Sequence, residues 1–322
     1  MLFPVSGVEC PFWLPPLVAF LISSITTSAG VSGAFLLLPF QMSVLGFTSP
    51  SVSPTNLIYN IVAIPGGIYR YMKEDRMAWP LTWVIVIGTL PGVFTGSIIR
   101  IKYLPDPKNF KLFIGLVLLY LGGRLLYELT GRSKKGKEQS AAIEKNFQER
   151  VNQAKAEGRG RVAGLGEDAI IRTKSVSLRK IEYEFWGETF SFSPAAIFTL
   201  SLVVGLIGGI YGIGGGAIIA PFVVAVLGLP VYTVAGAALS GTFITSIAGV
   251  LFFEILARTA VGQSADIRPD WLLGAMFGVG GLAGTYVGAR IQKFLPELLI
   301  RAILGILIIS LAIRYIIQFV YA

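Results

Sequence analysis

Two glycine-rich stretches could expose backbone N–H groups to an anion. They are Ala29–Gly33 (AGVSG) and Gly212–Gly216 (GIGGG). The first interrupts 35 uncharged residues, Phe12–Gly46, which as one helix would span about 52 Å against a hydrocarbon core of about 30 Å. A helix that restarts after such a break presents unpaired N–H groups and a partial positive charge, which together bind anions. The candidate backbone ligands are Ser32, Gly33, Gly212, Gly214, Gly215 and Gly216.

Polar side chains follow each break on the next expected helix. Asn56 and Asn60 lie one turn apart after the first break, and Ser240, Thr242 and Thr245 follow the second. Polar groups within a membrane point away from lipid because they need hydrogen-bond partners. These side chains therefore either join helices to one another or bind the oxygens of a small oxyanion, and the sequence leaves both alternatives open.

The two glycine-rich stretches belong to an internal repeat. With an offset of 182, Gly33 falls on Gly215, and with an offset of 192 the stretch that contains Gly88, Gly92 and Gly96 resumes the match. The latter three glycines correspond to Gly280, Gly284 and Gly288. Both sets have GxxxGxxxG spacing, which predicts close backbone packing between helices. One apolar unit thus occurs twice, each time beginning with a glycine-broken segment.

Composition predicts an all-α polytopic membrane protein. The 322 residues are 54% hydrophobic and 14% charged, with a mean hydropathy of +0.71, whereas soluble domains carry about 25% charged residues. The chain has no histidine and one cysteine, Cys10. Ser–His and Cys–His nucleophiles and histidine-ligated metals are therefore excluded. No carboxylate falls in the middle of an expected span, so we expect no enzyme, no metal and no cofactor.

The expected organisation is a first repeat over 1–128, a central region over 129–193 and a second repeat over 194–322. Arg76 and Arg100 bracket one span and mark its interfacial ends. The crossings are either eight full spans plus two half-helices, or an inverted 5+5 repeat, which we favour because 35 residues exceed one crossing. Expected apolar segments are 12–29, 33–46, 53–71, 77–99 and 109–129, then 194–211, 217–228, 233–256, 270–292 and 297–320.

The central region carries 13 of the 27 basic residues. Such an excess favours a cytosolic side under the positive-inside rule and does not require nucleic acid. A polar helix is expected over Ala141–Ala156, and alternating residues around Trp186–Gly187 predict a hairpin over Ile181–Ser193.

Several motifs resemble the sulfite exporter TauE/SafE family of membrane permeases. They are GIYGIGGGAIIAP, its diverged partner SAGVSGAFLLLP, and LPVYTVAGAALSGTFITSIAGV, with RKIEYEFWGETFSFSP typical of a subgroup with an enlarged central loop. The resemblance implies that small sulfur oxyanions or organosulfonates are moved, usually outward. It carries Gly212, Gly214, Gly215, Gly216 and Pro221 over as motif residues, whereas the first repeat has Ser32-Gly33-Ala34 in place of the triple glycine.

The sequence thus predicts a permease for small sulfur-containing anions in the plasma membrane, exporting them, with the central loop in the cytosol. Its expected partners are a small anion and the lipid bilayer, with no nucleic acid, and a homodimer is left open. The alternatives are an anion channel or facilitator of other specificity, and a membrane scaffold or sensor that acts through the central region.

Overall fold

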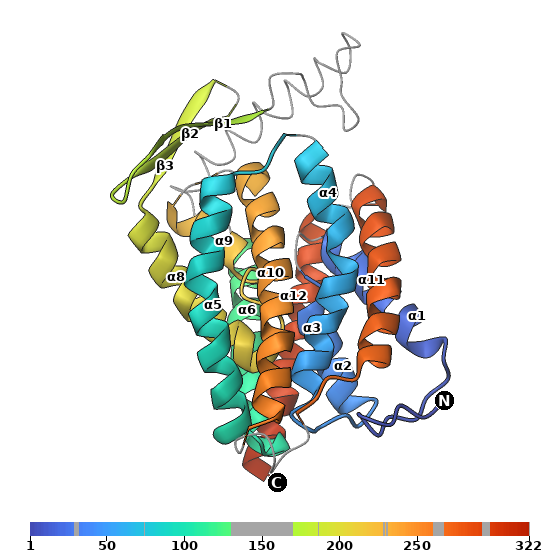
Figure 1. The fold of residues 1–322 in the computed structure, drawn as a ribbon. Coiled ribbons are helices and arrows are strands. Elements are labelled where there is room, and N and C mark those ends of the chain that lie inside the picture. The colour runs from blue at the N-terminus through green and yellow to red at the C-terminus, as the bar shows by residue number, and fades with distance from the viewer. Residues whose placement is uncertain are drawn as a thin grey trace.

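The structure is a computed structural model and describes residues 1–28, 32–73, 75–129, 170–185, 187–227, 229, 231–259, 267–291 and 297–321. These residues are mostly helical, and their helices stand side by side in one bundle (Figure 1). A small sheet lies at one end of the bundle, while the N-terminus and the C-terminus lie toward the opposite end. Residues 29–31 of the first expected break and the helix expected over Ala141–Ala156 lie outside the described residues.

Long apolar segments form helices because the bilayer core offers no water to satisfy free backbone groups. Among the described residues, five helices are long and apolar enough to cross a membrane, and two shorter apolar helices accompany them. The helices are α1 (Leu14–Ser28), α2 (Ala34–Ser43), α3 (Val52–Ala63), α4 (Pro65–Lys73), α5 (Trp79–Lys102), α6 (Pro107–Leu129), α8 (Pro194–Tyr211), α9 (Ile219–Leu227), α10 (Val231–Ala257), α11 (Trp271–Ile291) and α12 (Glu297–Tyr321).

One expected segment is divided. The sequence predicts a single helix over 53–71, but α3 ends at Ala63 and α4 begins at Pro65. Pro65 has no N–H to continue the ladder, and the two glycines that follow it weaken a helix further. The apolar segment therefore contains two short helices in place of one long one.

The glycine ridges hold pairs of helices together, as their spacing predicts. The ridge of α5 packs on α8, and the ridge of α11 packs on α1. A Cβ added at Gly88 would lie 2.7 Å from the Cβ of Ser201 in α8. A Cβ added at Gly284 would lie 2.9 Å from the Cα of Phe20 in α1. Only a residue without a side chain allows the backbones to come this close.

A three-stranded antiparallel sheet corrects the expectation of an all-α protein. Its strands are β1 (Ile171–Val176), β2 (Ile181–Phe185) and β3 (Glu188–Phe192), in the order β1-β2-β3. β2 and β3 form a hairpin where the sequence alternates, and β1 is an addition that the sequence analysis did not predict. Alternate residues of β2 are buried, and Tyr183 hydrogen-bonds the hydroxyl of Thr233 in α10 at 2.8 Å. The sheet is therefore fixed to the helical bundle.

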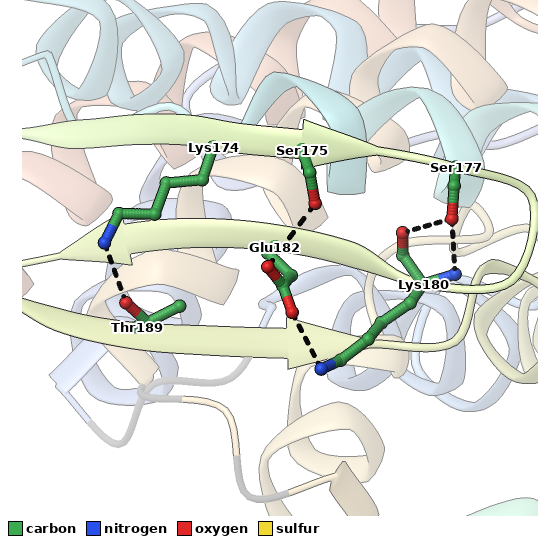
Figure 2. Close-up of polar contacts among 6 residues, drawn as sticks. All are labelled: Lys174, Ser175, Ser177, Lys180, Glu182 and Thr189. Atoms are coloured by element: carbon green, nitrogen blue, oxygen red, sulfur yellow. Dashed lines mark hydrogen bonds and ion pairs between the residues drawn. The ribbon is translucent and has the colours of Figure 1, made fainter.

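The other face of the sheet is polar. Figure 2 shows Lys174 donating to Thr189, and Lys180, just before β2, reaching Glu182 on the same strand. Lys174 also forms an ion pair with Glu184, at 2.9 Å. The sheet thus has an apolar face toward the helices and a charged face toward solvent.

Candidate substrate site

The second glycine-rich stretch ends α8 in a left-handed turn. Gly212 has φ +85° and Gly214 has φ +78°, a region that costs residues with a Cβ. The N–H groups of Gly212 and Ile213 both bond to the carbonyl of Gly208, which closes the helix end. The chain then runs without helical structure to the start of α9 at Ile219. The expected break over Gly212–Gly216 is present.

The first break needs glycine for a different reason. Gly33 has φ −64°, which any residue can adopt. A Cβ there would lie 2.6 Å from the hydroxyl of Tyr59 and 3.0 Å from the hydroxyl of Ser23, two groups that bond each other at 2.8 Å. Ser32 accepts the N–H of Ala34 at the start of α2, at 3.3 Å. Close approach of side chains, and not backbone conformation, explains the glycine.

Asn56 connects the two breaks. Its Nδ2 donates to the carbonyl of Ala34 at 3.0 Å and to the carbonyl of Gly212 at 2.9 Å. Its Oδ1 accepts from Nε2 of Gln41, at 3.2 Å. Asn56 and Gln41 are both fully buried. Two segments more than 150 residues apart in the sequence therefore meet at one amide.

Asn60 lies one turn further along α3 and contacts the second break. Its Nδ2 donates to the carbonyl of Ile213 at 2.9 Å and to the hydroxyl of Ser246 at 3.3 Å. Its Oδ1 is buried and has no hydrogen-bond partner among the described residues. Exchanging the oxygen and nitrogen of the amide would break the bond to Ile213. The orientation that leaves Oδ1 without a donor is therefore set by that bond.

The hydroxyl groups of α10 divide into two sets. Thr245 accepts the N–H of Gly215 at 3.1 Å, and a Cβ at Gly214 would lie 2.9 Å from Cγ2 of Thr242. Both threonines lie at the second break. Ser240 instead contacts the sulfur of Met77, at 3.6 Å, before the start of α5. The structure thus brings Thr242 and Thr245 to the break and turns Ser240 toward another segment.

Several of the predicted residues are already hydrogen-bonded in this structure, to one another or to their neighbours at the breaks. Asn56 and Asn60 hold backbone carbonyls of the breaks, as expected for joints between helices. An oxyanion would have to replace some of these bonds, so the role of these residues as substrate ligands stays a prediction. Sequence reasoning did not find Gln41, whose only visible signal is an amide within an apolar half-helix.

Two further polar side chains at the breaks were also missed. Tyr211 ends α8 and donates to the carbonyl of Phe35 in α2 at 2.7 Å, which gives the two breaks a second direct connection. Ser53 in the first turn of α3 donates to the carbonyl of Ile210 at 3.2 Å. No spacing rule distinguishes these residues from other polar residues of the apolar segments.

The chain matches the sulfite exporter TauE/SafE family over residues 16–315, a range that contains both breaks and all the helices just described as meeting there. It belongs to the sulfite exporter TauE/SafE family. No curated protein and no solved structure matches it. As a TauE/SafE protein it is a multi-pass membrane transporter for a small substrate, and it is not an enzyme.

Proposed function

We propose that this TauE/SafE transporter moves small sulfur-containing anions, such as sulfite or organosulfonates, outward across the cell membrane. The observation that carries the proposal is Asn56, which hydrogen-bonds the carbonyls of Ala34 and Gly212 and so brings both breaks to one point. Broken helices are tolerated in a membrane where they face protein or a water-lined cavity. In many secondary transporters such breaks form the substrate site near the midplane.

The site would combine backbone N–H groups at the breaks with nearby amide and hydroxyl groups. Its proposed members are Ser32, Gly33, Asn56, Asn60, Gly212, Gly214, Gly215, Gly216, Ser240, Thr242 and Thr245. Of these, Ser240 has the weakest support because it faces Met77. All of these residues belong to one chain, and a homodimer stays a prediction.

Two inverted repeats would provide the alternating access. The support is the reciprocal packing of α1 on α11 and of α5 on α8. Gly92 faces the backbone of Leu202, and Gly284 faces the backbone of Phe20. The two glycines differ by 192 positions and their partners by 182, the same offsets that relate the two halves of the sequence. α8 also begins beside the sheet, whereas α1 begins toward the opposite end (Figure 1).

The basic central region supports an orientation with the sheet on the cytosolic side. Because α12 ends at the opposite end of the bundle, the C-terminus would then lie outside (Figure 1). Labelling a cysteine introduced at Ser177 on the sheet, in a Cys10→Ala background, with a membrane-impermeant reagent tests this. Labelling in inverted vesicles and not in intact cells is the expected result, and the reverse pattern would contradict the orientation.

Two alternatives lead to different experimental results. A channel with the same site would carry the anion down its gradient only. A scaffold or sensor would depend on the central region, so deleting residues 131–168 should abolish its phenotype, whereas a transporter should keep some flux. Tyr183 attaches the sheet to α10, which favours the transporter, because the central region then supports the helical bundle and does not act on its own.

Binding to the purified protein tests the substrate class. Thermal shifts would be measured with sulfite, sulfoacetate, thiosulfate, taurine, sulfate and chloride at constant ionic strength. A ligand at one hundred times its dissociation constant stabilises by about 2.7 kcal/mol. We expect stabilisation by sulfite or a sulfonate, lost in a folded Gly214→Leu variant and kept in Gly123→Leu, where nothing lies within 4 Å of an added Cβ. If no anion raised the melting temperature, we would interpret the glycines as packing residues only.

A further inference from the structure

A buried arginine lies next to the second break. Arg100 is in the last turn of α5, and its side chain is fully buried. Within the described part of the chain, no carboxylate pairs with it. An arginine stays charged in proteins, and burying a charge without a counter-charge is costly. The location of Arg100 therefore requires an explanation.

The hydrogen bonds of Arg100 leave part of the guanidinium group unused. Nε donates to the hydroxyl of Ser53 at 3.3 Å, and Nη1 donates to the carbonyl of Leu104. The guanidinium plane lies over the ring of Phe110, with Cζ 3.6 Å from the ring centroid. Nη2 is buried and has no acceptor among the described residues. Because Nη2 carries two N–H donors, a cationic edge of the group is without a partner.

Capping the end of α5 explains only one edge of the side chain. A cation is favourable at a helix C-terminus, and the bond from Nη1 to Leu104 serves that purpose. The same role does not use Nη2. It also does not account for the contact with Ser53, which lies in the first turn of α3, where the helix dipole is positive and repels a cation.

Ser53 places Arg100 beside the break. Its hydroxyl donates to the carbonyl of Ile210, the penultimate residue of α8, at 3.2 Å. A Cβ added at Gly212 would lie 2.6 Å from the Cα of Ser53. Arg100, the N-terminus of α3 and the second break thus form one continuous group. A positive side chain with an unused donor and a positive helix end at the same place both favour an anion.

We propose that Arg100 binds the transported anion, with Nη2 donating to an oxygen of a sulfite or sulfonate group at the junction of α3, α5 and α8. This inference rests on the proposed function and names a ligand residue for it. Nη2 is the one guanidinium nitrogen that Ser53 and Leu104 leave unused, and a charge-assisted hydrogen bond from it to an oxyanion would be strong. The second half offers no equivalent, because the offset of 192 places Gln292 at this position. The two repeats would therefore contribute unequally to the site.

The same oxyanion chemistry is available from a phospholipid headgroup. Arg100 lies near the end of a span, where a lipid phosphate could reach the site. A free anion and a lipid headgroup can be distinguished by adding lipid. A free anion should bind to protein in a neutral detergent with no anionic lipid, whereas a lipid site should be saturated by added phosphatidylglycerol, which would then weaken sulfite binding.

Sulfite dissociation constants are compared for the wild type, Arg100→Gln, Arg100→Lys and the control Arg314→Gln, whose side chain is exposed on α12. The measurements use neutral detergent at fixed ionic strength and are repeated with phosphatidylglycerol. A charge-assisted hydrogen bond predicts about 10- to 100-fold weaker binding in Arg100→Gln. Arg100→Lys keeps the positive charge without the planar guanidinium, so it should lose less affinity than Arg100→Gln. Arg314→Gln should bind as the wild type does.

Each outcome decides one point. Unchanged sulfite binding in a folded Arg100→Gln, with only a lower melting temperature, would show that Arg100 only caps α5 and would leave the proposed function intact. Phosphate or sulfate binding that depends on Arg100, without sulfite binding, would keep the site and refute the substrate class. Loss of sulfite binding on adding phosphatidylglycerol would assign the site to lipid. A wild type that binds no oxyanion would overturn both proposals.

Discussion

Removing the amide that joins the two breaks should weaken the fold measurably. Asn56→Ala deletes three hydrogen bonds, two donated to the carbonyls of Ala34 and Gly212 and one accepted from Gln41. Polar bonds between membrane helices average about 0.6 kcal/mol, and buried bonds in general about 1 kcal/mol. The expected loss in free energy of unfolding is therefore about 2–3 kcal/mol. All three former partners are buried and would each lose this hydrogen bond.

The assay is equilibrium unfolding of the purified protein in mixed micelles, followed by tryptophan fluorescence. The control is Thr95→Ala, because the hydroxyl of Thr95 bonds only to its own helix, at Pro91, and is exposed. A change within about 0.5 kcal/mol is expected for such a surface residue. If Asn56→Ala were no more destabilised than Thr95→Ala, the claim that this amide holds the breaks together would be refuted.

Three further predictions concern helix packing and the sheet. Gly92→Ala would place a Cβ 2.7 Å from a backbone nitrogen of α8 and should cost about 1–3 kcal/mol in unfolding free energy, whereas Gly123→Ala, with open space around it, should be neutral or stabilising. Tyr183→Phe removes the bond to α10 and should speed amide exchange in the sheet; unchanged exchange would contradict the attachment. Hydrogen bonds from neighbouring lysines hold the pKa of Glu182 and Glu184 below the usual 4.5. Their contribution to sheet stability is thus full above pH 4.5 and is lost as the pH falls through their lowered pKa values, which amide exchange against pH would check, with high salt reducing the effect.

Local signals explain why much of the helical layout could be predicted from the sequence. Ser193 and Pro194 begin α8, and Gly212 ends it, at the residues that cap and turn signals indicate. The glycine ridges on α5 and α11 were likewise predicted from spacing alone, because their packing depends on a period that the sequence displays.

Contacts between distant segments could not be predicted in the same way. Nothing local indicates that Asn56 reaches Gly212, since the contact exists only after α3 packs beside the end of α8. Arg100 was interpreted as a residue at the end of a span, where a charge reaches the interface. Its burial depends on the ring of Phe110 and on Ser53, and thus on tertiary packing.

Counterflow in proteoliposomes tests whether this protein is a sulfite transporter. Vesicles preloaded with unlabelled sulfite would be diluted into trace labelled sulfite, and accumulation of label would be followed for the wild type, Gly214→Leu and Gly123→Leu. The account predicts transient accumulation above the outside concentration in the wild type and in Gly123→Leu, and its absence in a folded Gly214→Leu. Sulfite uptake that never exceeds equilibrium would indicate a channel, and no uptake of sulfite or any sulfonate would contradict the account.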